Sequence, residues 1–338
     1  MKIAIAQVNA HGGVLGRKLT LETYDSQANP ATAVSLFRKA QQAGPIALLY
    51  PGLTSGETLA VAPLAARAGV LSMNSAASSA LNSPKKVPLY LAVTSGPVGA
   101  NLVVAALKKQ HLTKVGLLYD NGEYGTTASA YYKQALQAAG ITISDSESFA
   151  ITDTTFTSQL AKIKSSGAQA LVFDATGAAA FSIMANANTV GLNVPFFAGQ
   201  AVVPDILDGA VPANVLARTT LVDYAISSTS ALSNPHVVAF RKSLTADGIN
   251  LTKTDMYLPA QGYDQIELFA AAAKAAHSVS SKAVYDTLRS RTWPKAGNAW
   301  LCYDYKWPAD SNFVTPGPGD VLLTKAARDS QGLHKPLS

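Results

Sequence analysis

The chain has 338 residues, of which 48% are hydrophobic and 14% are charged, and its formal net charge is +6. This length and hydrophobic content predict a packed protein with two lobes and exclude a disordered chain. The basic residues are scattered without a cluster, which argues against a nucleic-acid partner, and the single cysteine, Cys302, excludes an internal disulfide and a cysteine-based zinc site.

The start of the chain allows two interpretations. Met1–Val8 alternates well enough that its pattern alone predicts a first strand. Leu19–Asp25 is predicted as a strand that ends at Asp25. Asn29 followed by Pro30 is typical of a helix start, and we expect that helix to continue through Ala43.

The next stretch shows the features of a binding site. An apolar run, Ile46–Tyr50, predicts a buried parallel strand, which breaks into a small polar turn containing Ser55. A helix over Thr58–Ala68 and a short strand over Val70–Met73 follow, and this strand runs into small hydroxyl residues that include Ser78. Free amides at a helix start and hydroxyl groups at adjacent strand ends bind ligands in open α/β sheets, so we expect a ligand site here.

Strands and helices continue to alternate, which implies parallel, doubly wound sheets with right-handed crossovers. The expected strands are Pro88–Val93, Lys114–Tyr119, Ile141–Phe149, Ala168–Asp174, Val194–Ala198, Ala299–Tyr305 and Gly319–Thr324. The expected helices are Val98–Gln110, Thr126–Ala139, Thr155–Ser166, Thr176–Val190, Asn234–Asp247, Met256–Ala276 and Val279–Arg289.

The sequence carries no motif of a common enzyme class. It lacks the glycine-rich nucleotide loops, the paired-histidine zinc motif and the serine nucleophile elbow. The histidines are isolated, and each is predicted to be a surface residue. Asp25, Asp120, Asp174 and Asp264 lie at strand ends or on helices, but their spacing does not require any two to meet. We therefore expect no catalytic residue, no cofactor and no metal site.

Five segments, in chain order, resemble the leucine/isoleucine/valine-binding-protein type of periplasmic substrate-binding protein, the receptor of an ABC importer. They are Asn9–Leu19, Tyr24–Pro30, Tyr50–Asn82, Tyr119–Gly125 and Phe156–Leu160. The resemblance covers nearly the whole chain and implies the type I periplasmic binding fold, with two doubly wound parallel-sheet α/β lobes joined by a three-strand hinge. We expect lobe 1 to contain residues 1–95 and 223–304, and lobe 2 to contain residues 96–222 and 305–338.

The resemblance also implies the ligand-binding residues. In lobe 1 a carboxylate site is expected at Ser55, Ala76 and Ser78, and the other expected ligand contacts are Ser95, Tyr124, Thr176 and Gln200. Capping of a helix N-terminus is the alternative role for Ser55 and Ser78, and the two roles are compatible. Gln200 stands where amino-acid-binding relatives carry an acidic residue for the ligand ammonium, and Ser95 stands where many carry an acidic residue or threonine. A neutral amide does not repay the desolvation of a cation, so both argue against a free α-amino acid.

By the same resemblance we expect an extracytoplasmic solute-binding receptor, located in the periplasm, which closes its lobes on a small ligand. The ligand would be a carboxylate or an amino-acid-like compound held in the cleft between the lobes, and the partner of the monomeric protein would be a membrane permease. The alternative is a ligand-sensing domain of a signalling receptor or of an amide-sensing regulator with the same fold.

The alignment with this family changes the interpretation of the chain start. It places Ile5–Asn9 at the end of the first helix, and we adopt this helix in preference to the strand. A signal peptide, a first strand and a first loop are then expected to be missing ahead of Met1. The loop around Trp307 departs from the family pattern and has no assigned role.

Overall fold

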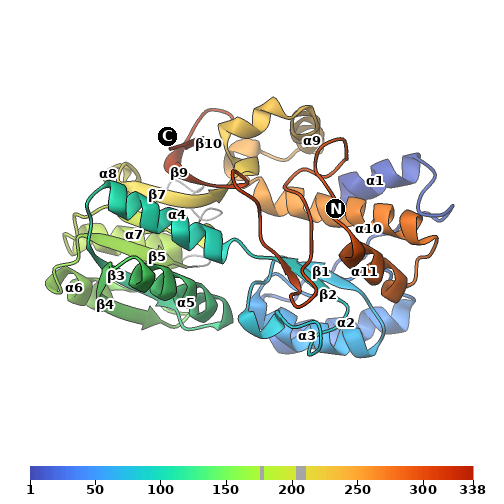
Figure 1. The fold of residues 1–338 in the computed structure, drawn as a ribbon, viewed down its shortest axis with the longest axis horizontal. Coiled ribbons are helices and arrows are strands. Elements are labelled where there is room, and N and C mark those ends of the chain that lie inside the picture. The colour runs from blue at the N-terminus through green and yellow to red at the C-terminus, as the bar shows by residue number, and fades with distance from the viewer. Residues whose placement is uncertain (176–178, 203–210, 338) are drawn as a thin grey trace. The chain divides into compact units, whose positions relative to one another are not determined.

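The computed structural model describes residues 1–175, 179–202 and 211–337, and the chain divides into two compact units. Unit 1 comprises Met1–Thr94 and Tyr257–Gly317, and unit 2 comprises Ser95–Met256 and Pro318–Ser338. The chain therefore passes between the units three times (Figure 1), as in the expected three-strand hinge.

The later boundaries of these units differ from the expected ones, 222/223 and 304/305. Residues 223–256 lie in unit 2, where Ser227 donates a hydrogen bond to Asp255 and Ser228 forms a parallel bridge with His334. Residues 305–317 lie in unit 1, where Tyr305 donates a hydrogen bond to Asp264. These contacts join segments far apart in the sequence, so the pattern of single elements does not reveal them.

Unit 1 is built around a three-stranded parallel sheet in the order β1-β2-β8. Its strands are β1 (Ser72–Asn74), β2 (Tyr90–Val93) and β8 (Phe313–Val314). Its helices are α1 (Lys2–Ala10), α2 (Pro30–Ala43), α3 (Ser55–Arg67), the 3₁₀ turn η1 (Ser79–Leu81), α10 (Tyr257–Ala276) and α11 (Ser281–Ser290). Figure 1 shows α10 and α3 on opposite faces of the sheet, as in a doubly wound fold, and both contact β1.

Two predicted helices of this unit, at the chain start and after Asn29, are confirmed, whereas α3 begins at Ser55, three residues before the predicted Thr58. The first residues form α1, as the family alignment predicts and the alternating pattern does not. In α2 the Asn29 side chain accepts hydrogen bonds from the main-chain amides of Ala31 and Thr32, with Pro30 at the first helical position. Local signals are sufficient here because a cap needs only residues within one turn.

Three predicted strands of unit 1 are corrected. Leu19–Asp25 forms no strand, and Ile46–Tyr50 contributes one parallel bridge, from Leu49 to Ser72. Ala299–Tyr305 forms only an isolated bridge to Trp293, because the main-chain amides of Leu301 and Cys302 bind the buried carboxylate of Asp264 at 2.6 and 2.9 Å. A strand needs a partner at the right place, and composition alone does not supply one.

Unit 2 contains a seven-stranded sheet in the order β10-β9-β7-β6-β5-β3-β4. Its strands are β3 (Lys114–Asp120), β4 (Thr142–Phe149), β5 (Ala170–Asp174), β6 (Phe196–Ala198), β7 (Thr219–Tyr224), β9 (Val321–Arg328) and β10 (His334–Pro336). Strands β3, β4, β5 and β6 run parallel, as predicted, and β7, which the sequence analysis does not include, is a fifth parallel strand. In contrast, β9 pairs antiparallel with β7, and β10 pairs antiparallel with β9. The carboxyl ends of the parallel strands thus share one edge, the edge that binds ligands in open α/β sheets.

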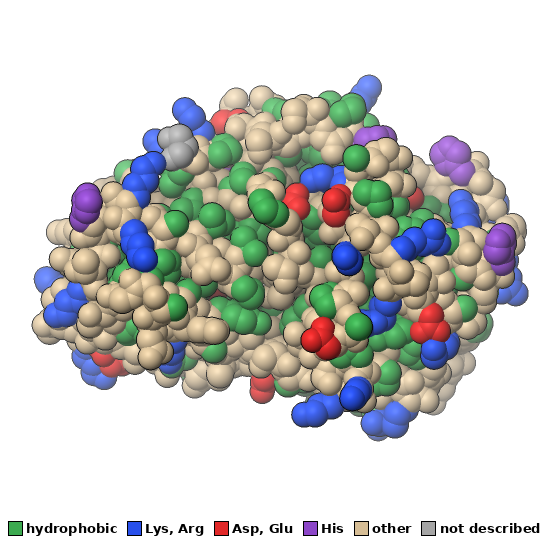
Figure 2. Space-filling model, viewed as in Figure 1, with side chains coloured by type: hydrophobic (Ala, Val, Ile, Leu, Met, Phe, Trp, Pro, Cys, Tyr) green, Lys and Arg blue, Asp and Glu red, His purple; other side chains and the backbone are tan. Residues whose placement is uncertain are grey.

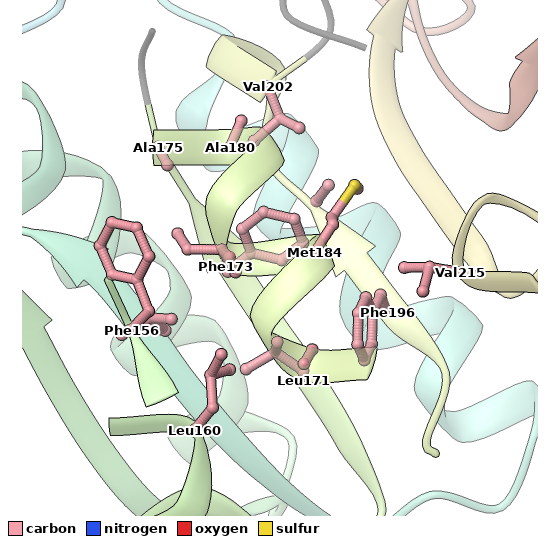
Figure 3. Close-up of a cluster of buried hydrophobic side chains, with 14 of the residues drawn as sticks. Phe156, Leu160, Leu171, Phe173, Ala175, Ala180, Met184, Phe196, Val202 and Val215 are labelled. Atoms are coloured by element: carbon pink, nitrogen blue, oxygen red, sulfur yellow. The ribbon is translucent and has the colours of Figure 1, made fainter. Parts of the chain in front are cut away.

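The helical elements of unit 2 connect these strands. They are α4 (Gly96–Lys109), α5 (Glu123–Ala138), α6 (Thr157–Ser165), α7 (Ala179–Thr189), α8 (Ala213–Leu216), η3 (Ala225–Ser227), η4 (Thr229–Ser233), α9 (Pro235–Ala246) and η5 (Leu251–Lys253). The core between the sheet and helices α6 and α7 is apolar (Figure 3). The rings of Phe173 and Phe196 pack edge to face, with 6.2 Å between their centroids, and Met184 lies beside them. This packing orders the strand ends that carry the polar side chains described below.

Charged side chains are dispersed over the surface. Figure 2 shows Lys and Arg side chains spread singly or in small groups, and no continuous basic area covers the face in view. In the ranges that the structure describes, no helix is both long and apolar enough to cross a membrane.

Candidate functional site

In unit 1 the strongest candidate for a ligand contact is the Ser55 hydroxyl, at the start of α3. Thr54, and not Ser55, caps this helix. The Thr54 hydroxyl accepts from the Glu57 amide at 3.2 Å, and the Glu57 carboxylate accepts from the Thr54 amide at 2.9 Å, which completes a capping box. The Ser55 side chain is 4% exposed, and its Oγ has no hydrogen-bond partner in the described part of the chain. An unpaired buried hydroxyl at a helix N-terminus suits an anionic group.

The other two expected residues of unit 1 lie in the turn after β1. Ser78 is fully buried, and its hydroxyl accepts a hydrogen bond from the Ala80 amide at 3.3 Å as the cap of η1. The Ala76 amide donates to the Asn74 side chain at 3.1 Å, and its carbonyl accepts from the Tyr90 hydroxyl at 3.0 Å. The main-chain amide and carbonyl of Ala76 therefore already form hydrogen bonds within the protein. Of Ser55, Ala76 and Ser78, Ser55 has the polar group that is most available to a ligand.

Asn74, which the sequence analysis does not include, holds these turns together. Its side chain is 1% exposed, and its Nδ2 donates to the Gly52 carbonyl at 2.8 Å and to the Thr58 hydroxyl at 2.7 Å. Its Oδ1 accepts from the Tyr90 hydroxyl at 2.7 Å, in addition to the Ala76 amide. The sequence signal for it is an asparagine that directly follows a buried apolar strand.

In unit 2 the Tyr124 hydroxyl donates a hydrogen bond of 2.9 Å to the Asp174 carboxylate. Tyr124 lies in the first turn of α5, and Asp174 is the last residue of β5. Gly199 directly follows β6 and lies against Asp174. A Cβ atom at position 199 would lie 2.0 Å from Asp174 Oδ2 and would clash, so glycine is required there. Asp174 therefore orients Tyr124 at the carboxyl edge of the sheet.

Burial raises the pKa of Asp174 to about 7, and the negative charge of Asp120 adds to this rise. Asp120 ends the neighbouring strand β3 and accepts from the Gly122 amide at 2.9 Å, and burial raises its pKa as well. Two acidic side chains thus meet at this edge, a proximity that their spacing in the sequence does not require.

Ser95 and Gln200 meet within unit 2. The Ser95 hydroxyl, just before α4, donates a hydrogen bond of 2.6 Å to Gln200 Oε1, which follows β6. The carbonyl oxygen of the Gln200 amide therefore faces Ser95, and its Nε2 donor lies on the other side of the amide. Thr176, the remaining expected contact, lies outside the described residues.

The loop around Trp307 belongs to unit 1. The Trp307 ring stacks on Tyr305 at 5.6 Å, and its Nε1 donates to the Ala92 carbonyl at 3.3 Å. The Trp307 side chain is thus buried against β2, whereas its neighbours Lys306 and Asp310 are exposed. Among the described residues no group of three or more His, Cys, Asp or Glu side chains is placed to hold a metal ion.

Comparison with known sequences identifies the family of this chain. The sequence profile of the periplasmic binding protein family matches residues 1–306. This chain belongs to that family. Its curated relatives include the Leu/Ile/Val-binding protein BraC3 of Rhizobium johnstonii, 30% identical over 50% of this chain and 47% of the relative. The Leu/Ile/Val/Thr-binding protein of Salmonella typhimurium is 22% identical over 59% of this chain and 55% of the relative. The chain thus matches about half the length of these curated relatives.

Solved structures of other periplasmic binding proteins share the fold over almost the whole chain. A type 1 periplasmic binding protein from Bordetella pertussis Tohama I has a TM-score of 0.84, with 20% identity over 99% of this chain and 93% of that one. A solute-binding protein of an ABC transporter from R. palustris, in complex with benzoate, has a TM-score of 0.79, with 20% identity over 99% and 91%. The branched-chain amino acid transporter substrate-binding protein of Streptococcus pneumoniae, in complex with isoleucine, has a TM-score of 0.79, with 19% identity over 98% and 90%. These similarities establish the type I periplasmic binding fold.

Proposed function

We propose that this periplasmic binding protein is the extracytoplasmic receptor of an ABC importer and that it binds a small carboxylate. The observation that carries the proposal is the Ser55 hydroxyl, which is buried, unpaired among the described residues and placed at the N-terminus of α3. A carboxylate would accept a hydrogen bond from this hydroxyl and would be stabilised by the positive end of the helix dipole.

The ligands of two structural neighbours support a carboxylate. Isoleucine and benzoate, as bound in the neighbours from S. pneumoniae and R. palustris, share a carboxylate and differ in the rest of the molecule. In the proposal Ser55 and Ser78 hold the shared group. Tyr124 and Gln200 contact the part that differs.

The residues of unit 2 favour a ligand without an ammonium group. The Gln200 amide would present its Nε2 donor to a ligand, because its carbonyl oxygen faces Ser95. The nearby carboxylate of Asp174 is only 4% exposed, and its Oδ2 accepts from Tyr124, whereas its Oδ1 has no hydrogen-bond partner among the described residues. Burial raises its pKa to about 7, so its charge is weakened as a partner for a cation. We therefore infer a ligand whose second polar group is a hydrogen-bond acceptor, or which has no second polar group.

The receptor role includes two further proposals. The chain would act in the periplasm and deliver its ligand to a membrane permease, as the family membership suggests. It would bind and release the ligand unchanged, with no covalent step, because relatives across the family are solute-binding proteins. Ligand binding would shift the protein between conformations only to the extent that the ligand binds one of them more tightly.

Calorimetric titration of the Ser55→Ala variant tests the proposal. Loss of a hydrogen bond to a charged group costs roughly 1.5–3 kcal/mol, so affinity for the carboxylate should fall roughly tenfold to a hundredfold. The Ser35→Ala variant is the matched control, because Ser35 lies exposed on α2 and its hydroxyl bonds only to its own helix. Equal affinities for both variants would remove Ser55 from the site.

A second variant tests the ligand class. Gln200→Glu places a carboxylate next to Ser95 and should raise the affinity for leucine relative to 4-methylpentanoate, the analogue that lacks the amino group. An unchanged ratio of the two affinities would mean that Gln200 does not contact the part of the ligand that differs.

A further inference from the structure

A small cavity lies inside unit 1, between the sheet and α10. Its apolar lining comes from Met73 on β1 and from Leu91 and Val93 on β2, and α10 contributes Gln261 and Gln265. These two glutamines are four residues apart, so they lie on the same face of α10, about one turn from each other. Apolar strand residues thus face two amide side chains that are only 2% and 4% exposed.

The Gln265 side chain lacks a hydrogen-bond partner that its burial calls for. Its Oε1 is buried and accepts no hydrogen bond from any residue that the structure describes. Such an atom has given up its hydrogen bonds to bulk water on folding, and native proteins rarely leave it without a replacement. We therefore expect a hydrogen-bond donor inside the cavity.

Two other polar side chains of the lining have no group left to offer. Asn74 lines the cavity, but the four hydrogen bonds described above use both of its donors and both acceptor positions of its oxygen. Trp307 has a single donor, Nε1, and this group already donates to the Ala92 carbonyl. Neither side chain can therefore satisfy Gln265 Oε1 directly.

Gln261 and Tyr305, which also line the cavity, each keep a hydrogen-bonding position. The Gln261 Nε2 donates one hydrogen bond, to the Tyr257 hydroxyl at 2.9 Å, and has a second N–H to donate. The Tyr305 hydroxyl donates to Asp264 at 2.7 Å, and its oxygen can still accept. A small molecule that both donates and accepts would join these two groups to Gln265.

The size and the charge of the cavity restrict its occupant. The room that it offers is about 10 Å³, which is roughly what one ordered water molecule requires. No charged side chain of a described residue lines it, because the Asp264 carboxylate of the same helix binds the main-chain amides of Leu301 and Cys302. An ion would lack a counter-charge there, and a carboxylic acid would not fit.

We propose that this cavity binds a single structural water molecule. The water donates a hydrogen bond to Gln265 Oε1, and Gln261 and Tyr305 complete its hydrogen bonds, which gives the usual number of about three for a buried water. It lies beside Asn74, which joins the turns around Ser55 and Ala76. The water site belongs to unit 1 alone and does not depend on which ligand the candidate site binds.

A crystal structure of the full chain, at a resolution that shows ordered water, tests the proposal. We expect a density peak within hydrogen-bond distance, about 2.7–3.2 Å, of Gln265 Oε1 and of at least one of Gln261 and Tyr305. Absence of this peak would overturn the proposal. A Gln265 amide rotated so that its nitrogen bonds to a protein carbonyl would overturn it as well.

A variant tests whether Gln265 holds the water. Gln265→Met keeps a side chain of similar length but removes the amide, so the crystal structure of this variant should lose the peak. Gln134→Met, at an exposed position of α5, is the matched control and should keep it. A peak that persists in Gln265→Met would contradict the proposal, and the structure of the unaltered chain decides alone if this variant does not fold.

Discussion

At the scale of single residues, Asn74 has the largest predicted structural effect in unit 1. Its side chain makes four hydrogen bonds that join the turn at Gly52, helix α3, the turn at Ala76 and strand β2. Asn74→Ala leaves the buried Tyr90 hydroxyl and other groups without these bonds, so it should lower the free energy of unfolding by about 2–4 kcal/mol. Urea denaturation measures this loss. Asn188→Ala, at an exposed position of α7, should change stability by less than about 0.5 kcal/mol, and a similar loss in both variants would contradict the role of Asn74.

Asp174 should make stability depend on pH. In the unfolded chain its carboxyl ionises near pH 3.8, whereas in the folded protein its pKa is about 7. The folded state therefore binds more protons between these values, and the contribution of Asp174 to stability falls as the pH rises through this window. Asp174→Asn removes this term, and its Oδ1 still accepts from Tyr124. The variant should thus gain on the order of 2 kcal/mol over the unaltered chain between pH 5 and pH 8, and parallel stability curves would show that Asp174 does not titrate as proposed.

At the scale of elements, the turn before α3 depends on Gly52. Its φ is +141°, and a Cβ atom there would lie 2.5 Å from the Cβ of Glu57, which belongs to the capping box. Gly52→Ala should therefore cost about 1–3 kcal/mol more than Gly69→Ala, whose site has φ +71° but no atom within 4 Å of the added Cβ. Thermal unfolding of the two variants gives the comparison, and equal costs would mean that the turn adjusts freely.

Elements with local signals are predicted correctly, and elements that depend on distant partners are not. The Asn29-Pro30 start of α2 and the apolar strands β3 and β5 follow from adjacent residues, so the sequence is sufficient for them. The strand predicted over Ala299–Tyr305 is lost to the Asp264 carboxylate, which lies 37 residues from Leu301 in the sequence. Thr54 and Glu57 form a capping-box pattern that the sequence analysis overlooks, and this pattern distinguishes the capping residue from the free Ser55.

The residues of the candidate site also divide into those that the sequence suggests and those that only the structure reveals. Ser55, Ser78, Tyr124 and Gln200 come from resemblance to a family, and their roles in ligand binding remain predictions. Asn74 and Asp174 emerge only in three dimensions, because their partners come from several strands and turns. Such supporting residues carry little sequence signal, since their function is to hold other side chains in place.

At the scale of the whole molecule, two α/β units connected three times form the framework of a binding protein. The family match covers residues 1–306, and neighbours of known structure share the fold over almost the entire chain. The central claim is that this framework binds a small carboxylate reversibly.

The most direct test is a thermal melt of the full chain with a panel of ligands. The panel contains branched-chain amino acids, aromatic and aliphatic carboxylates, the corresponding amides, and small polyols. A ligand at 100 times its dissociation constant adds about 2.7 kcal/mol of stability, which raises the midpoint measurably. We predict that carboxylates without an ammonium group raise the midpoint and that their amides do not. A sharp transition that no carboxylate shifts, or that polyols alone shift, would contradict the account.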